Sequence, residues 1–161
     1  MRKAIVLLTG IAVLALVNFS IARKEQLLAN GRVVLLELAP VDPRSLMQGD
    51  YLALRFRLQD DLGRAHNPGD GYLVVAPDSR GVAAFCRLDR GEPLASGELR
   101  IHYRWRNNRP RLGSNAFFFQ EGQAGLYQGA RFGEARIDDS GEMLLTGLRD
   151  ADLRKLGPKR Y

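Results

Sequence analysis

The first long apolar segment of the chain covers residues 4–22, which contain no charged residue. Its aliphatic side chains would cover every face of a helix, which is typical of a segment surrounded by lipid. At about 1.5 Å per residue, a helix of this length just crosses a hydrocarbon core of roughly 30 Å. Basic pairs flank it at Arg2-Lys3 and Arg23-Lys24. The pattern predicts a transmembrane helix that inserts residues 4–22 into the lipid bilayer.

A cleaved signal peptide is the alternative interpretation of this segment. Ser20-Ile21-Ala22 offers the small residues that precede a cleavage site. However, the apolar run is longer than the roughly 7–15 residues of a signal-peptide core, and cleavage would leave Arg23-Lys24 immediately downstream. We therefore expect an uncleaved signal-anchor in the cell membrane. The short N-terminal flank favours a cytoplasmic N-terminus and an extracytoplasmic, for example periplasmic, C-terminal part.

After the anchor, short apolar segments alternate with turn residues. Residues 25–31 keep a helical composition and end at Asn30-Gly31, a favourable helix C-cap. Residues 32–38 are rich in valine and leucine and predict a first strand. Residues 51–58 alternate strictly between apolar and other side chains, which is typical of a half-buried strand. The side chains expected to face the core are those of Leu52, Leu54, Phe56 and Leu58.

The rest of the chain predicts more strands and few helices. Strands are expected at residues 71–76, 82–88, 98–106, 115–119, 134–138 and 142–148, with short helices at 121–132 and 150–156 and a loop at 60–70. Six to eight strands with one or two short helices indicate a β-rich α+β fold, mostly antiparallel. The predicted organisation is a membrane anchor with a juxtamembrane helix over residues 1–30, followed by one β-rich domain over residues 31–161.

The net charge of +6 belongs mostly to the anchor. Four basic and no acidic residues precede residue 25, whereas the remainder holds 20 basic and 18 acidic residues. A nearly balanced domain does not have the basic excess of a nucleic-acid-binding protein, so no nucleic-acid partner is expected.

No convincing catalytic arrangement can be found in the sequence. Ser45 near the membrane is similar to the nucleophile of a serine-lysine signal peptidase, but its lysine would have to be Lys155 or Lys159 in the C-terminal tail. No serine lies in a nucleophile-elbow context, so His66 and His102 have no nucleophile to activate as general bases. We expect no catalytic residues.

Metal and cofactor sites are also not expected. One cysteine and two histidines do not provide zinc-type spacing, and the acidic pairs Asp60-Asp61 and Asp138-Asp139 lack a calcium-loop pattern. Cys86 lies in an apolar run, which favours a small buried core residue.

A basic face is a candidate binding surface. Arg100, Arg104 and Arg106 share the outward side of the strand predicted at residues 98–106, and Arg87, Arg109 and Arg111 could add to it. Such a face would attract anionic lipid headgroups or an acidic envelope polymer. The alternative is a solvated strand face whose charges are balanced by neighbours such as Asp89 and Glu98.

The pattern Gly49-Asp50-Tyr51-x-x-Leu54-x-Phe56 resembles the signature of the GDYXXLXY family of membrane-anchored proteins, with Phe56 where that signature has tyrosine. Segments at residues 117–122, 127–134 and 147–148 are also similar to the family. The resemblance implies no particular reaction. It implies a link to multi-pass membrane proteins, because genes of the family commonly lie beside genes for such proteins.

The loop that carries this signature has two interpretations. Its charged residues flank a proline, so it can form a salt-bridged turn that positions the following strand. Alternatively it lies near the membrane and forms an interaction loop for a partner, the function we expect for an accessory protein of a multi-pass membrane protein. A hydrolase or ligand-binding protein that uses a cleft beside this loop is the alternative function. The interaction loop comprises Asp42, Arg44, Ser45, Gly49, Asp50 and Tyr51.

Overall fold

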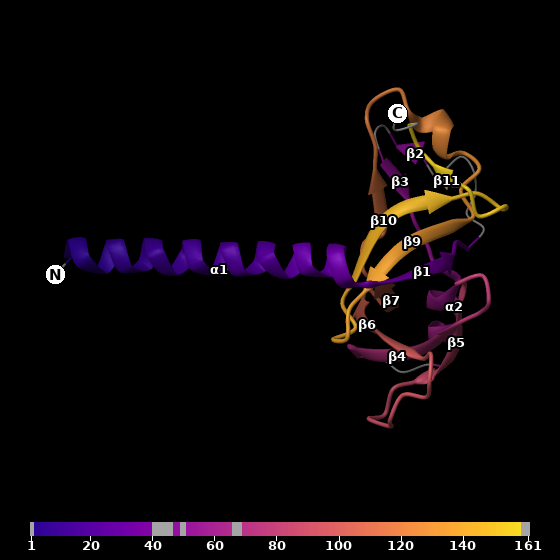
Figure 1. The fold of residues 1–161 in the computed structure, drawn as a ribbon, viewed down its shortest axis with the longest axis horizontal. Helices are drawn as coiled ribbons and strands as arrows, with labels where there is room; N and C mark the ends of the chain where they lie inside the picture. Colours follow the sequence, from indigo (N-terminus) through magenta and orange to yellow (C-terminus); the bar gives the residue numbers. More distant parts are fainter. Residues whose placement is uncertain (1, 40–46, 49–50, 66–68, 159–161) are drawn as a thin grey trace.

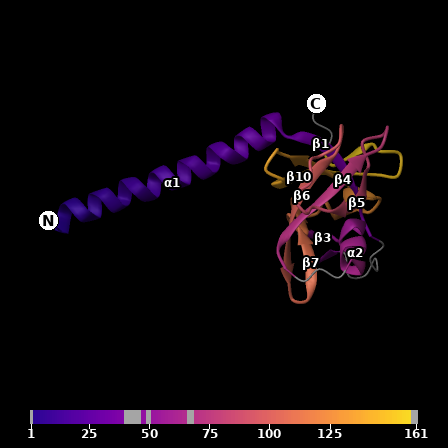
Figure 2. The same ribbon diagram turned by 90° about the horizontal axis from the view of Figure 1, so that it is seen from below.

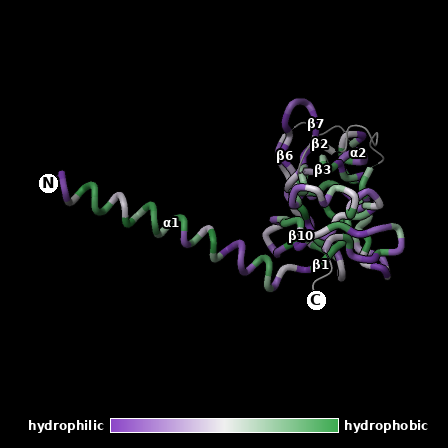
Figure 3. The backbone as a smooth tube through the Cα atoms, turned by 90° about the horizontal axis from the view of Figure 1, so that it is seen from above, coloured by the Kyte–Doolittle hydropathy of each residue, from purple (hydrophilic) through white to green (hydrophobic). Residues whose placement is uncertain are grey.

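The computed structural model describes residues 2–39, 47–48, 51–65 and 69–158. Its most prominent element is α1 (Arg2–Asn30), a single helix of 29 residues that projects away from the remaining chain (Figure 1). Within it, residues 5–30 contain a window of mean hydropathy 2.5 in which no residue is buried. Figure 3 shows this apolar character along the projecting helix. By length and composition, α1 can cross a membrane, as a signal sequence also can.

The end of α1 is fastened to the β-rich domain. Leu27 is the first described residue along α1 that is buried, and Gly31 follows the helix so closely that a Cβ there would lie 2.4 Å from the Leu27 carbonyl oxygen. Arg136 donates to the carbonyl oxygens of Ala29 and Gly31 at 3.3 and 3.2 Å. The helix therefore passes into the first strand through a packed joint and not through a free linker.

Beyond α1 the described strands form three antiparallel sheets (Figures 1 and 2). The first sheet, in the order β1-β9-β10-β11, contains β1 (Arg32–Glu37), β9 (Phe132–Ile137), β10 (Met143–Arg149) and β11 (Lys155–Leu156). The second, β2-β3-β8, contains β2 (Met47–Gln48), β3 (Tyr51–Ala53) and β8 (Ala116–Phe118). The third, β5-β4-β6-β7, contains β4 (Gly71–Pro77), β5 (Ala83–Leu88), β6 (Leu99–Arg106) and β7 (Arg109–Leu112).

One hydrophobic core joins the sheets. Bridges from β1 to Val82 and from Leu38 to Phe56 connect the first sheet to segments next to the other two. The largest side chains that are almost fully buried include Phe56 and Tyr103. The predicted β-rich α+β fold with an N-terminal apolar helix is confirmed, with eleven strands among the described residues, more than the six to eight expected.

The strand expected over residues 51–58 is too long. β3 ends at Ala53, and α2 (Arg57–Arg64) begins directly after Phe56. The expected inward side chains, Leu52 to Leu58, are all buried, as predicted. However, Leu58 shares its burial with Leu62, four residues later, and this spacing places both on one face of a helix. Helix α2 thus replaces the first part of the loop expected at residues 60–70.

A hairpin at Asn107-Asn108 was not predicted. These two residues have φ of 51° and 58°, the left-handed conformation of a two-residue hairpin turn, which asparagine tolerates well. The turn joins β6 to β7, and Arg106 faces Arg109 across the strands. Pro110 is accommodated because β7 is an edge strand, where a missing N–H group costs no ladder bond.

Three further expectations near the C-terminus and in the core are wrong. Residues 121–132 contain only a one-turn 3₁₀ helix, η1 (Ala124–Tyr127), because their glycines disfavour a longer helix. The helix expected at 150–156 is a turn followed by β11, since Asp150 accepts backbone hydrogen bonds from Asp152 and Arg154. Cys86 is exposed, because the apolar run that contains it is a strand whose alternate side chains face solvent.

Candidate functional site

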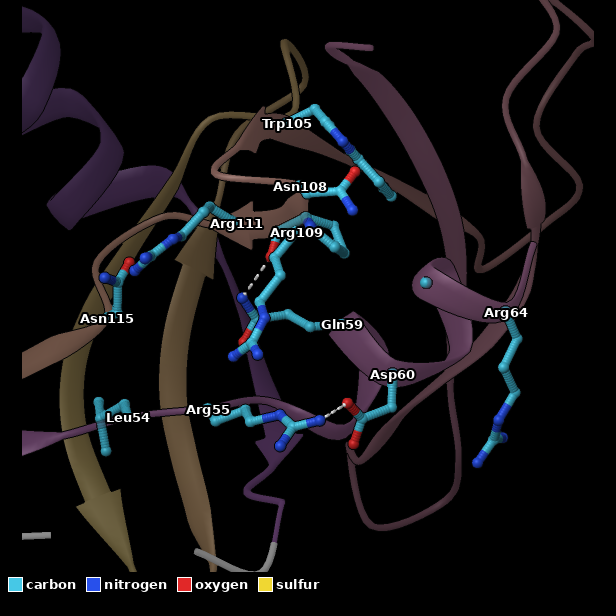
Figure 4. Close-up of a pocket in the computed structure, with 12 residues that line it drawn as sticks. Leu54, Arg55, Gln59, Asp60, Arg64, Trp105, Asn108, Arg109, Arg111 and Asn115 are labelled. Atoms are coloured by element: carbon cyan, nitrogen blue, oxygen red, sulfur yellow. Dashed lines mark hydrogen bonds and ion pairs between the residues drawn. The ribbon is translucent and has the colours of Figure 1, made fainter. Parts of the chain in front are cut away.

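One groove of the domain lies between α2, the β6–β7 hairpin and the chain after β3 (Figure 4). Its volume is about 750 Å³. Leu54 and Arg55, which directly follow β3, form part of its wall, so the signature strand leads into it. Trp105 and Asn108 contribute from the hairpin. The contact between α2 and β7 therefore helps to form the groove.

Positive charge dominates the groove. Four arginines and one aspartate line it. Arg55 is neutralised by Asp60 within the groove, and Arg64 lies 3.1 Å from Asp61. Arg109 and Arg111 form no ion pair with any residue in the described part of the chain. No carboxylate in the described ranges therefore neutralises these two guanidinium groups.

Two polar side chains hold the groove walls in place. Gln59 accepts a hydrogen bond from the Phe56 backbone N–H at 2.8 Å and donates one to the Pro110 carbonyl oxygen at 2.8 Å, which ties α2 to β7 (Figure 4). Asp70 accepts from the Trp105 backbone N–H at 2.7 Å and pairs with Arg106 at 3.0 Å. The Trp105 N–H bond and the Arg106 hydrogen bond hold the pKa of Asp70 below its ordinary value.

The described side chains that line the groove are suited to binding an anion. No serine, cysteine, histidine or lysine is found among the described residues that line it, and Asp60, its sole carboxylate, is paired with Arg55. The lining includes two guanidinium groups and, elsewhere in the groove, an indole ring, which together suit an anionic ligand with a flat or apolar part. No cluster of three metal-ligating side chains occurs in the described residues.

Most of the predicted interaction loop lies outside the described residues. This is the case for Asp42, Arg44, Ser45, Gly49 and Asp50, and for His66. Tyr51 is described: it opens β3, pairs with Phe118 of β8 and packs against that ring in a tilted arrangement, with 5.8 Å between the ring centroids. Lys155, one of the two lysines considered as partners of Ser45, lies 3.7 Å from Glu134.

The three arginines of the predicted basic face lie in different environments. Arg100 forms an ion pair with Asp89 at 3.2 Å, and Arg106 forms one with Asp70. Arg104 is exposed and has no ion pair with a described residue. Arg87, considered as an addition, is paired with Glu98 and Glu92. Along β6, positive charge is thus left unpaired at Arg104.

The groove itself was missed at the level of sequence. Helix α2 falls within the strand expected at residues 51–58 and the loop expected at 60–70, and β7 falls between the strands expected at 98–106 and 115–119, so no pattern brings Arg55 near Arg109. Two features of the sequence could have indicated it. Leu58 and Leu62 have helical spacing, and Asn107-Asn108 between two segments rich in arginine is a typical hairpin turn.

Comparison with known proteins supports the resemblance seen in the signature. No curated protein and no solved structure is significantly similar to the chain. The model of the GDYXXLXY protein family matches residues 13–148, which include the second half of α1, the packed joint and the sheets up to β10. The match covers well over half of the chain, and the chain therefore belongs to the GDYXXLXY family.

Proposed function

We propose that this protein is a single-pass membrane protein with a cytoplasmic N-terminus and an extracytoplasmic domain that serves as an accessory partner of a multi-pass membrane protein. The observation that carries the proposal is the continuous α1, whose apolar side chains are exposed on all sides over residues 5–21. A lipid bilayer, or the helices of a partner within it, would cover these side chains.

The packed joint supports a domain held at the membrane surface. Leu27 and Gly31 are locked against β9, and Lys24 lies 3.6 Å from Glu142. These contacts begin within about one turn of the expected end of the span at residue 22. A domain held this close can present a fixed surface to the extracytoplasmic loops of a neighbouring membrane protein.

An exposed aromatic patch beside the interaction loop supports the docking hypothesis. Phe118 is 73 % exposed, and its ring packs in a tilted arrangement against that of Tyr51, the last residue of that loop. Exposed aromatic side chains are enriched at protein–protein interfaces. Residues 42–51 together with Phe118 are therefore our proposed contact surface for the partner.

The single cysteine allows a direct test of orientation. Cys86 is exposed, and the chain contains no other cysteine. A membrane-impermeant maleimide should label Cys86 in intact cells whose outer barrier has been opened, without lysis of the cell membrane, and Cys86→Ser should abolish the labelling. Labelling only after lysis would contradict the extracytoplasmic location.

The partner hypothesis is tested by crosslinking in membranes. A photoreactive residue at position 118 should yield a crosslink to a multi-pass protein that also co-purifies from gently solubilised membranes. The same residue at position 131, which is exposed at the end of β9 remote from α1, is the matched control. Equal yields at both positions, or no adduct at 118 in membranes where the complex co-purifies, would argue against this surface.

Ligand binding in the groove is a second candidate function, favoured by the unpaired Arg109 and Arg111. At low ionic strength, the protein should bind polygalacturonate, a carboxylated polymer, and not neutral dextran. Arg109→Gln with Arg111→Gln should weaken this binding roughly tenfold, since two charge-assisted contacts are lost. Calorimetry measures the affinities, and Arg131→Gln is the control. Unchanged affinity in the double variant would exclude the groove as the site.

A further inference from the structure

A second space, of about 450 Å³, lies between α1 and the domain. On the helix side it is lined by residues spaced three or four apart, which share one face of α1. On the domain side it is lined by Arg104 of β6 and by Asp138 and Glu142 near the β9–β10 turn. The helix residues are Leu16, Phe19, Ser20, Arg23, Lys24 and Leu27. We call this space the wedge.

The wedge crosses the expected membrane surface. The uncharged run ends at residue 22, so Leu16 and Phe19 belong to the hydrocarbon layer and Arg23 and Lys24 to the headgroup layer. Leu16 precedes Arg23 by seven residues, which corresponds to roughly 10 Å along the helix. Because Arg104 borders the same space as Leu16 and Phe19, this edge of the domain is brought to the level of the lipid headgroups.

The charges within the wedge are not balanced locally. Lys24 is matched by Glu142 at 3.6 Å. The Asp138 carboxylate is occupied by its own turn, where one of its oxygens accepts hydrogen bonds from the backbone N–H groups of Ser140 and Glu142 and from the Ser140 hydroxyl. Arg23 and Arg104 form no ion pair with any residue that the structure describes.

We propose that the wedge binds one anionic phospholipid. Its phosphate would lie between the guanidinium groups of Arg23 and Arg104, and an acyl chain would run along Leu16 and Phe19. Guanidinium groups bind phosphate oxygens through paired, charge-assisted hydrogen bonds. The lining contains three cations and two carboxylates, and this net charge of +1 favours a headgroup with net negative charge over a zwitterionic one. The inference rests on the proposed membrane anchoring. It adds a bound lipid next to the packed joint between α1 and the β-rich domain.

The test uses the full-length protein in nanodiscs that contain equal amounts of phosphatidylglycerol and phosphatidylcholine. After mild detergent exchange, mass spectrometry quantifies the lipid that stays with the protein. The wild type should retain phosphatidylglycerol at about a fivefold enrichment over phosphatidylcholine, the factor expected for the wedge's single net positive charge near a lipid surface. Arg104→Gln should reduce this enrichment towards unity, and Arg104→Lys should keep most of it.

Arg131→Gln provides the matched control, because Arg131 is exposed and its position adjoins the end of β9 that is remote from α1. Equal retention of both lipids by the wild type would overturn the inference, as would full enrichment in Arg104→Gln. Alkaline carbonate extraction of native membranes separates this inference from the proposed function. A protein that resists extraction but shows no lipid preference refutes the wedge alone, whereas a protein released by carbonate refutes the anchor and the wedge together.

Discussion

Replacement of Phe56 by alanine is expected to lower the free energy of unfolding by about 3–5 kcal/mol, the usual loss for a large aromatic side chain in a packed core. Phe56 is only 1 % exposed. Its ring lies against Gly133 of β9, where an added Cβ would meet it at 2.9 Å. Its backbone bridges to Leu38 and caps α2. The cavity left by the substitution would lie where the first sheet, the signature strand and α2 meet. It would therefore weaken the packing of all three.

Chemical denaturation of the full-length protein in detergent micelles measures this effect. Trp105, the chain's single tryptophan, is half-buried on β6 and reports unfolding by fluorescence. Phe118→Ala is the matched control, since Phe118 is 73 % exposed and should cost less than about 1 kcal/mol. If the two variants unfold at the same denaturant concentration, Phe56 is not the central core residue that we infer.

Removal of the Glu134 carboxylate is expected to have the second largest effect, about 2 kcal/mol at neutral pH for Glu134→Gln. Glu134 is 8 % exposed on β9 and accepts from Arg149 Nε at 2.7 Å, while Lys155 lies 3.7 Å away. Thr146 donates to it at 3.3 Å. The variant would leave the Arg149 guanidinium half-buried without its anion and would loosen β11 against β10.

The same carboxylate predicts a dependence on pH. Burial raises the pKa of Glu134, but the hydrogen bond from Arg149 and the charges of Arg149 and Lys155 outweigh burial and hold the pKa below its ordinary value. A lowered pKa in the folded state stabilises the fold above the unfolded-state pKa of about 4.3, and this contribution is lost as the pH falls through the folded-state pKa.

Denaturation curves at several pH values check this prediction. The difference in stability between wild type and Glu134→Gln should be constant near neutral pH and should shrink below about pH 4. Glu121→Gln is a control, because Glu121 is exposed in a turn and has no ion pair with a described residue. A difference that grows on acidification would contradict the assigned direction of the pKa shift.

Sequence patterns correctly predicted the elements whose conformation is set by residues close in sequence. The length of the apolar run predicted α1, and strict alternation correctly predicted which side chains between Leu52 and Leu58 are buried. Both properties are set within a few residues, by the helical rise and by the alternation of side chains along an extended chain. The signature at residues 49–56 indicated the family, which the match over residues 13–148 confirms.

Sequence patterns gave the wrong secondary structure where contacts with residues distant in sequence decide the local conformation. Residues 57–58 continue an alternating pattern, yet they start a helix, because Leu58 and Leu62 together fill a place beside β1, β5 and β7. Arg109 and Pro110 lie between the strands expected at residues 98–106 and 115–119, yet they form an edge strand held by Gln59, which lies 51 residues before Pro110. Single-sequence propensity is a weak prior that tertiary packing overrides.

The sequence by itself determined the apolar helix, the β-rich class of the domain, the balanced charge of that domain and the family signature. Only the tertiary structure decided which charges remain unpaired. Arg100 and Arg106 form ion pairs with carboxylates on neighbouring segments, whereas Arg104, Arg109 and Arg111 form none with any described residue. The physical reason is that an ion pair depends on the distance between side chains in space, and the folding of β6 and β7 against α1 and α2 sets that distance.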